Sequence, residues 1–263
     1  MVKSTSTIPV DLSIPNIKAF YTTKNGGFSV GNFASLNLGL HVDDDPVAVL
    51  KNRLLLEDMI HKKIVFMDQT HSAIVKVVDN HDLADAKQML DGKTPISLGV
   101  KADGVVCFED DIAIAVLTAD CLPLLLATED GSAIAAVHCG WKGIYQNIAK
   151  NAVALIRERT QSSIKAYLGP CIGPKSFEVG ADLKEKFLAL DTAFSKAFTP
   201  KNNDKYLCSL ASLCSMQLKK LGIDNITDSN TDTFDENNEL FSYRKSHITG
   251  RIATVIYKSS TKF

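Results

Sequence analysis

Cys121 and His138 are the residues whose types and spacing first suggest chemistry. They belong to two apolar segments of β type that flank an Asp130-Gly131 turn. If that turn is a two-residue type I′ loop, His138 pairs with Pro123 and is a diagonal neighbour of Cys121. A loop shifted by one residue pairs the thiol directly with the imidazole, so both registers bring the two side chains within roughly 5–8 Å. Because proline cannot donate to a ladder, pairing should weaken near Cys121.

A second imidazole extends this pair to a set of metal ligands. His71 precedes the alternating segment Ala73–Val78, and a side chain at that strand end could face the same cleft. Three protein ligands with a free fourth position are typical of catalytic zinc. The sequence therefore predicts a zinc site formed by His71, Cys121 and His138. The competing interpretation is that each is an ordinary core or surface residue, the commoner state of a single cysteine or histidine.

Composition limits the classes of protein to consider. The 263 residues are 45% hydrophobic and 22% charged, enough to bury a large core. The chain has no internal repeat, low-complexity tract or obvious linker, so we expect a single domain over residues 1–263. Lysine and arginine total 29 against 30 acidic residues. No overall electric field would therefore attract nucleic acid or an anionic membrane, and we expect neither as a partner.

The cellular compartment follows from the N-terminus and the cysteines. The first ten residues lack the long apolar core of a signal peptide, and the longest apolar segment, residues 112–127, is interrupted by Asp120 and Pro123. The six cysteines show no CxxC spacing, which favours reduced thiols over disulfides. We expect a cytoplasmic protein that is a monomer or a homodimer.

Periodicity predicts the elements that must position these residues. Strands are expected at Ile17–Thr22, Ile64–Asp68, Ala73–Val78, Gly104–Phe108, Ile112–Thr118, Leu122–Thr128, Ala133–His138, Ile164–Leu168 and Arg251–Tyr257. Helices are expected from Asp45-Pro46 to about Ile60, and at Gly143–Thr160, Asp182–Leu190 and Tyr206–Leu221. Polar segments at 80–95 and 200–205 should be surface excursions. Strands that follow one another without helices from 104 to 138 predict an α+β, or mixed α/β, fold with mixed, largely antiparallel sheets and flanking helices.

Motifs along almost the whole chain then resemble a known family. They are Gln69-Thr-His71, Ala102-Asp-Gly104, Thr118-Ala-Asp-Cys-Leu-Pro123, Val137-His-Cys-Gly-Trp-Lys-Gly143, Gly169-Pro-Cys-Ile-Gly173, Phe177-Glu-Val179 and Phe241-Ser-Tyr-Arg244. In this order they resemble the YfiH-type family, called laccase-domain or polyphenol oxidase protein in older naming and purine nucleoside phosphorylase in newer usage. The resemblance implies a YfiH-like fold. It also implies zinc on His71, Cys121 and His138.

The activity implied by this resemblance is phosphorolysis of purine nucleosides. Adenosine, inosine and S-methyl-5′-thioadenosine would react with phosphate to give the free base and ribose 1-phosphate. Adenosine deaminase activity is also implied, and for that reaction a water acidified by zinc could attack C6 while a carboxylate moves protons. Catalytic candidates beside Cys121 and His138 are the carboxylates of Asp120, Asp103 and Glu178. The alternatives are that Asp120 braces a turn and that Glu178 is a structural acceptor.

Phosphate and nucleoside contacts are predicted from glycines, cations and one aromatic residue. The candidates are Lys24, Gly27, Asn37, Trp141, Lys142 and Arg244. Lys24 and Lys142 stand where many family members carry arginine, so they keep the charge but lose the bidentate fork. Each has an ordinary alternative: a glycine pair marks a turn, a lysine at a helix start is solvated, and a single tryptophan belongs to the core.

Other functions remain open at this point. A multicopper oxidase requires many histidines, typically in His-x-His pairs, whereas this chain has six and no such pair. The scattered histidines His41, His61, His81 and His247 should mostly lie at the surface. Copper bound in vitro at the Cys/His/His site could still give weak polyphenol oxidase activity. The rivals are a cysteine hydrolase or deamidase, with Cys121 as nucleophile and His138 as base, and a non-enzymatic module related to cell-wall precursor editing.

Overall fold

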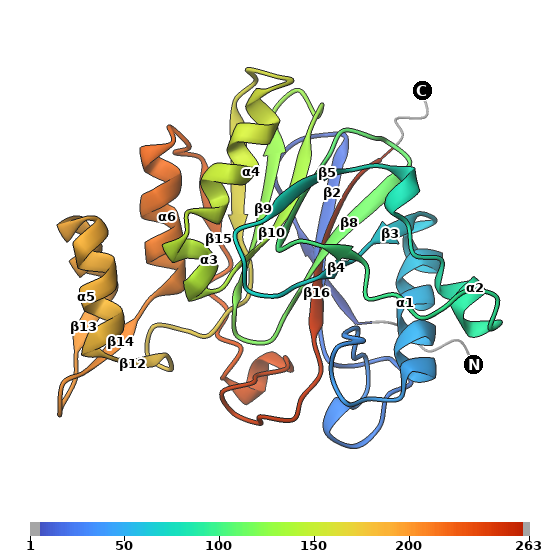
Figure 1. The fold of residues 1–263 in the computed structure, drawn as a ribbon, viewed down its shortest axis with the longest axis horizontal. Helices are drawn as coiled ribbons and strands as arrows, with labels where there is room; N and C mark the ends of the chain where they lie inside the picture. The colour runs from blue at the N-terminus through green and yellow to red at the C-terminus, as the bar shows by residue number, and fades with distance from the viewer. Residues whose placement is uncertain (1–5, 260–263) are drawn as a thin grey trace.

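Two β-sheets stacked face to face form the centre of the molecule, and helices cover their outer faces (Figure 1). The computed structural model describes residues 6–259. The first sheet has the strand order β1 (Thr7–Val10), β2 (Ile17–Thr22), β16 (Ile252–Lys258), β8 (Ile112–Thr118) and β3 (Lys63–Val65). Every residue of β8 is buried, because one of its faces meets the second sheet and the other meets a helix layer.

The second sheet carries the central hairpin. Its strand order is β15 (Ile226–Asp228), β11 (Ile164–Leu168), β9 (Leu122–Thr128), β10 (Ile134–Cys139), β7 (Gly104–Cys107) and β5 (Val75–Val78). The pairs β3–β8, β5–β7 and β11–β15 are parallel, and the other pairs in the two sheets are antiparallel. The predicted α+β fold with mixed, largely antiparallel sheets is therefore confirmed.

A long helix covers the outer face of the first sheet. α1 (Pro46–Ile60) packs Leu56 against Phe20 and Val255. It begins as predicted, because the Asp45 side chain accepts a hydrogen bond from a backbone N–H of the first turn and proline occupies the first helical position.

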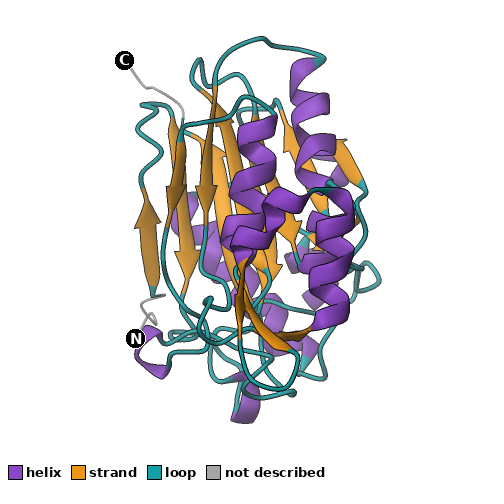
Figure 2. Cartoon of the chain, turned by 90° about the vertical axis from the view of Figure 1, so that its left-hand side faces the viewer, coloured by secondary structure: helices purple, strands orange, loops and turns teal. Residues whose placement is uncertain are grey.

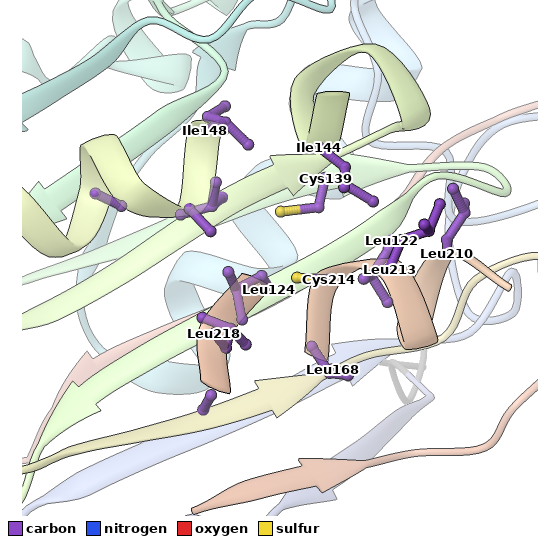
Figure 3. Packing of buried hydrophobic residues seen from close by; sticks show 14 of the residues in the cluster. Leu122, Leu124, Cys139, Ile144, Ile148, Leu168, Leu210, Leu213, Cys214 and Leu218 are labelled. Atoms are coloured by element: carbon purple, nitrogen blue, oxygen red, sulfur yellow. The ribbon is translucent and has the colours of Figure 1, made fainter. Parts of the chain in front are cut away.

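Three helices cover the outer face of the second sheet (Figure 2). They are α3 (Trp141–Tyr145), α4 (Ile148–Arg157) and α6 (Leu210–Lys220). Figure 3 shows Leu124 and Leu168 of the sheet packed with Leu213 and Leu218 of α6. None of the helices in the described part of the chain is both long and apolar enough to cross a membrane.

Smaller elements lie at the periphery. A three-stranded sheet has the order β12 (Glu178–Gly180), β14 (Lys205–Cys208) and β13 (Phe198–Pro200), and α5 (Ala181–Leu190) follows β12 directly. The strands β4 (Met67–Asp68) and β6 (Val100–Lys101) form a parallel pair. The segment 80–95, expected to be a surface excursion, contains α2 (Ala86–Leu90). Short 3-10 helices are η1 (Gly31–Phe33), η2 (Asn80–Asp82), η3 (Thr192–Ala197) and η4 (Glu236–Asn238).

The central hairpin has the first of the two predicted registers. His138 pairs with Pro123, and Cys139 pairs with Leu122. The ladder ends at Leu122, so Cys121 lies just outside β9, as the nearby proline led us to expect. The thiol and the imidazole are thus diagonal neighbours.

The hairpin turn is not the predicted type I′ loop. Gly131 has φ of 70°, but Asp130 is not among the described residues with positive φ. The Gly131 N–H donates to the Thr128 carbonyl at 2.8 Å, which gives a wider turn. The Asp130 carboxylate stabilises it by accepting from the Ser132 N–H at 3.0 Å and from the Ser132 hydroxyl at 2.7 Å. This side-chain bonding removes the need for a second residue with positive φ.

The single helix predicted over 143–160 is wrong. The chain forms α3 and α4 instead, and Asn147 separates them with φ of 59° in the left-handed region. The Asn147 N–H bonds to the Ile144 carbonyl, which closes α3 with a tight turn. Asparagine tolerates this conformation better than most residues, so the break is chemically reasonable.

The helix predicted from Tyr206 begins later. Residues 205–208 form β14, which pairs with both β12 and β13. The side chain of Ser209 then accepts a hydrogen bond from the Ser212 N–H at 3.0 Å and caps α6. The prediction merged a short strand with the helix because Tyr206 and Leu207 fit the apolar spacing of both.

Candidate metal centre

The two histidines and the cysteine of the predicted zinc site lie together at one end of the second sheet. Their donor atoms all lie within 4.8 Å of one another. Cys121 Sγ is 3.8 Å from His71 Nε2, and the centroids of the two imidazole rings are 4.7 Å apart in an edge-to-face arrangement. The structure thus brings together three side chains that stand 50 and 17 residues apart in the sequence.

Local backbone geometry directs these donors toward one point. Asp120, just before Cys121, has φ of 86°, and His71 has φ of 62°. Such conformations are costly for residues other than glycine and concentrate at functional sites. Gly140 keeps the centre open: a Cβ there would lie 3.0 Å from Cys121 Sγ, 3.4 Å from His71 Cδ2 and 3.7 Å from His138 Nε2. Glycine therefore leaves room between the donors.

Asp103 connects the two histidines. Its carboxylate is 0% exposed and accepts a hydrogen bond from His138 Nδ1 at 2.8 Å. It also accepts from the backbone N–H groups of Thr70, His71 and Ser72 at 3.1, 2.9 and 2.7 Å, and from the Ser72 hydroxyl at 2.7 Å. Burial raises the pKa of Asp103, but these hydrogen bonds outweigh it and hold the pKa well below its ordinary value. One carboxylate thus fixes one histidine by its ring and the other by its backbone.

The cysteine and His138 influence each other's ionisation. Burial alone would raise the pKa of the Cys121 thiol, but the charge of His138 and hydrogen bonds from both imidazoles lower it. Burial would likewise lower the pKa of His138, but Cys121 and Asp103 raise it. The environment therefore favours a thiolate, which is the form of cysteine that binds metals.

The donor set fits a metal ion. One soft thiolate and two imidazoles are typical ligands of zinc and also of copper. Because His138 Nδ1 bonds to Asp103, its Nε2 remains directed to the cluster, and such a carboxylate partner is usual for a metal-binding histidine. The cluster therefore indicates a metal ion.

A cavity of about 450 Å³ opens above the cluster. Its lining residues are His41, Gln69, His71, Leu117, Thr118, Ala119, Asp120, Cys121, His138, Trp141, Ile172, Phe177, Leu210, Tyr243, Arg244 and Arg251. Gln69 supports the floor, because its amide bonds to both backbone groups of Leu117 at 2.8 Å. The volume falls in the range of small-molecule sites, and the mixture of aromatic, polar and cationic side chains suits an organic ligand with polar groups.

Asp120 is the carboxylate in this lining, and both of its oxygens already accept hydrogen bonds. One accepts from the Thr233 hydroxyl at 2.6 Å and the other from the Arg244 N–H at 2.5 Å. Asp120 therefore holds the segment between β15 and β16, which brings Tyr243 and Arg244 to the cavity.

The remaining predicted contacts divide between the cavity and the surrounding surface. Trp141 and Arg244 line the cavity, and the Arg244 guanidinium lies 5.3 Å from the Phe177 ring centroid. Lys142 is exposed outside the lining, with Nζ 5.7 Å from the Trp141 ring. Glu178 also lies outside it and forms a 2.8 Å ion pair with Lys201 on the surface.

Lys24, Gly27 and Asn37 do not line the cavity. The Lys24 carbonyl accepts from the Ser35 N–H at 2.7 Å, and a Cβ on Gly27 would lie 2.2 Å from the Ser35 carbonyl oxygen. Glycine at position 27 is thus required by a close backbone approach. The Asn37 side chain is buried and bonds to the backbone of Gly39 and Arg251.

Sequence reasoning missed two cavity residues with strong chemical character. His41 was expected at the surface and is indeed exposed, but its place in the cavity lining was not foreseen, and Arg251 was noted only as the start of a strand. His41 stands four residues after Asn37, and Arg251 directly precedes β16. The sequence did contain one signal for Arg251: it is a polar residue at the end of a strand, where cavities often form.

Comparisons with known proteins agree with this geometry. The family model described as "Multi-copper polyphenol oxidoreductase laccase" matches residues 18–259. A Haemophilus influenzae protein named purine nucleoside phosphorylase is 38% identical over 247 residues, covering 92% of this chain and 94% of the relative. Purine nucleoside phosphorylase YfiH of Escherichia coli is 34% identical, and the match covers 92% of this chain and 93% of the relative. The crystal structure of Neisseria meningitidis protein NMB0706 is 33% identical with a TM-score of 0.84, covering 97% of this chain and all of that one. The crystal structure of Bacillus licheniformis hypothetical protein YfiH matches with a TM-score of 0.87 and 30% sequence identity, and the match covers 98% of each chain.

Proposed function

The chain belongs to the family described as multi-copper polyphenol oxidoreductase laccase, in which it is similar to proteins named purine nucleoside phosphorylase, and we propose that it is a zinc-containing enzyme of that activity. Its proposed substrates are adenosine, inosine and S-methyl-5′-thioadenosine, which react with phosphate to give the free base and ribose 1-phosphate. Adenosine deamination is the proposed side activity.

The observation that carries the proposal is the position of the donor cluster at the floor of a cavity of about 450 Å³. The cluster has three protein donors, and catalytic zinc sites typically use three and keep another position for water or substrate. Trp141 and Phe177 in the cavity wall offer aromatic faces on which a purine can stack. Arginines in the same wall can neutralise an anionic co-substrate.

Phosphorolysis requires that the cavity hold two reactants, phosphate and the nucleoside, in a fixed relative orientation. A phosphate oxygen forms a bond to C1′ of the ribose as the C1′–N9 bond breaks and its electron pair leaves with the purine. The proton that the phosphate loses balances the proton that the purine gains. The proposed contribution of the cavity is to exclude water from this exchange and to place phosphate beside C1′, because positioning supplies much of the rate.

His71, Cys121 and His138 are the proposed metal ligands. Zinc held there would supply a Lewis acid beside the cavity. Asp103 orients rather than transfers protons in this proposal, because it is buried behind His138 and already accepts hydrogen bonds from both histidine segments. Asp120 is proposed to hold the segment of Arg244 in place by its own hydrogen bonds.

Metal analysis coupled to product identification tests the proposal. Purified protein should contain about one zinc ion per chain. With phosphate, inosine should give hypoxanthine and ribose 1-phosphate, and adenosine should also give inosine. Free ribose formed at the same rate without phosphate would identify a hydrolase and contradict the proposal.

A second candidate function is a cysteine hydrolase, because the pKa of Cys121 is lowered beside His138. The two functions differ in the fate of the thiol. A metal-bound thiolate reacts slowly with alkylating reagents, whereas a free catalytic thiolate reacts quickly. Slow alkylation of Cys121 in the metal-loaded protein and faster alkylation after chelation favour the metalloenzyme. Full activity in metal-free protein, abolished by alkylation, favours the hydrolase.

A further inference from the structure

His41 and Arg251 lie side by side in the cavity wall, and the proposed function neither uses His41 nor says which wall arginine holds the anion. A Cβ built on Gly39 would lie 2.8 Å from Arg251 Cγ and 3.3 Å from His41 Cε1, so both side chains contact the same backbone position. Arg53 lies buried in the same region, where its Nε donates to the Leu38 carbonyl at 3.0 Å. The wall therefore combines the His41 imidazole with the Arg251 guanidinium, and the buried Arg53, which does not line the cavity, adds a positive charge near them.

This wall carries positive charge without a paired carboxylate. Among residues 6–259, neither Arg251 nor Arg53 forms an ion pair. Partial burial in the cavity lowers the pKa of His41, and the charges of Arg251 and Arg53 lower it further, to about 4. The imidazole is then neutral near pH 7 and offers one N–H donor. Asp120 in the same lining acts on Arg251 through its charge, but its oxygens already accept from Thr233 and Arg244, so an ion-pair partner for Arg251 has to come from an anionic ligand.

The guanidinium of Arg251 is held in a fixed orientation. Its Nη1 donates to the carbonyls of the two preceding residues at 3.0 and 2.9 Å, and its backbone N–H donates to Asn37 Oδ1 at 2.9 Å. Asn37 Oδ1 also accepts from the Gly39 N–H at 2.9 Å, which ties the segment of His41 to that of Arg251. Nε and Nη2 of Arg251 have no acceptor in the described part of the chain. Two donors thus remain for a ligand.

An unsatisfied hydroxyl in the same cavity independently indicates a polar ligand or an ordered water. Thr118 lines the cavity and is 1% exposed, yet its Oγ1 has no hydrogen-bond partner among the residues described. In the sheet it pairs with Ile252, the residue after Arg251. Buried polar groups are nearly always satisfied in the working state of a protein, by ligand or by water when not by protein.

We propose that Arg251 and His41 form the subsite for inorganic phosphate, an assignment that rests on the proposed phosphorolysis. The free Nε–H and Nη2–H of Arg251 match two phosphate oxygens, and the His41 N–H supplies a third donor. Asn37 is then a positioning residue that aligns the two segments. The subsite lies inside the cavity, unlike Lys24, which the sequence had favoured.

Two conservative substitutions and one control test the subsite. Arg251→Lys keeps the positive charge but loses the planar guanidinium that can bind two phosphate oxygens at once. His41→Gln keeps an N–H donor but changes its geometry. Arg159→Ala is the control, because Arg159 stacks on Phe108 at 4.2 Å and does not line the cavity. We expect the phosphate KM for inosine phosphorolysis to rise at least tenfold in Arg251→Lys and severalfold in His41→Gln. The inosine KM, zinc content and phosphate-independent adenosine deamination should change less than twofold, as should all values for the control.

A direct measurement separates this inference from the proposed function. Inorganic phosphate should raise the Tm of the wild-type protein and should raise that of Arg251→Lys much less. If wild-type protein performs phosphorolysis but neither variant changes the phosphate KM, the subsite is overturned and the function stands. If wild-type protein performs no phosphorolysis, the function fails, and an Arg251-dependent Tm response to phosphate still supports the subsite. Stabilisation by AMP but not by inorganic phosphate would instead overturn the assignment to free phosphate.

Discussion

At the scale of single residues, the candidate metal centre depends on a carboxylate that is not one of its three donors. Asp103 accepts hydrogen bonds from the ring of His138 and from the backbone around His71, and it is completely buried. A buried, ionised carboxylate is tolerated only when its acceptor sites are filled, and here the donors belong to the two histidine segments. The sequence motif Ala-Asp-Gly identified Asp103 as important but gave no means to distinguish orientation from proton transfer.

The first prediction concerns the thiolate ligand. Cys121→Ala should lower bound zinc from about one ion per chain to nearly none, because two imidazoles alone bind zinc weakly compared with a three-donor site. Inductively coupled plasma mass spectrometry of purified protein measures the content. Cys208→Ala is the matched control, since Cys208 is buried in the core away from the cluster. Zinc retained at wild-type stoichiometry in Cys121→Ala would refute the ligand assignment.

The second prediction concerns Asp103, which hydrogen-bonds to the two proposed histidine ligands. Asp103→Asn should weaken zinc affinity by about 10–100-fold, because the amide places an N–H₂ group where the carboxylate accepts from two histidine segments. Competition with a chromophoric chelator measures the affinity. Asp224→Asn, at an exposed position, serves as the control. Equal zinc affinities in Asp103→Asn and the wild type would show that the carboxylate supports only the fold.

At the scale of elements, the sequence was most informative where one segment has a single strong pattern. The strands β2, β8, β9 and β11 followed from apolar runs, which left two hairpin registers open, and the start of α1 followed from Asp45-Pro46. The sequence was less informative where the local chemistry of a residue competes with the apolar periodicity. The left-handed Asn147 divides an apolar helical pattern, and Tyr206 lies in a strand that exists only because β12 and β13 flank it. Neither tertiary pairing nor a single φ angle is visible in apolar spacing.

The third prediction concerns the turn that sets the hairpin register. Gly131→Ala should lower the free energy of unfolding by roughly 2 kcal/mol or more, because φ of 70° strains an L-residue and a Cβ there would lie 2.2 Å from Asn16 Nδ2. Gly92→Ala is the control, since φ is 66° there and a Cβ would meet nothing within 4 Å. It should cost only about 1 kcal/mol. Urea unfolding measures both, and equal losses would show that contact with Asn16 is unimportant.

At the scale of the whole molecule, the cavity is assembled from segments that are distant in the sequence. The end of the hairpin, the loop of His71, the segment of His41 and the strand end at Arg251 meet only because the two sheets stack. The hairpin could be deduced from local pattern, so Cys121 and His138 were found without the fold. His41 and Arg251 could not, because their proximity depends on Asn37 joining two segments that are 214 residues apart.

The same assembly predicts that metal binding stabilises the folded protein as a whole. The unfolded chain does not hold the proposed zinc ligands together, so free zinc at 100 times its dissociation constant should add about 2.7 kcal/mol to the free energy of unfolding. In a chain of this size that corresponds to a rise in Tm of roughly 5–10 °C. Differential scanning calorimetry of metal-free protein with buffered zinc measures the shift. The shift should be absent in Cys121→Ala and unchanged in Cys208→Ala. An equal rise in Cys121→Ala would mean that the stabilising zinc binds elsewhere in the chain.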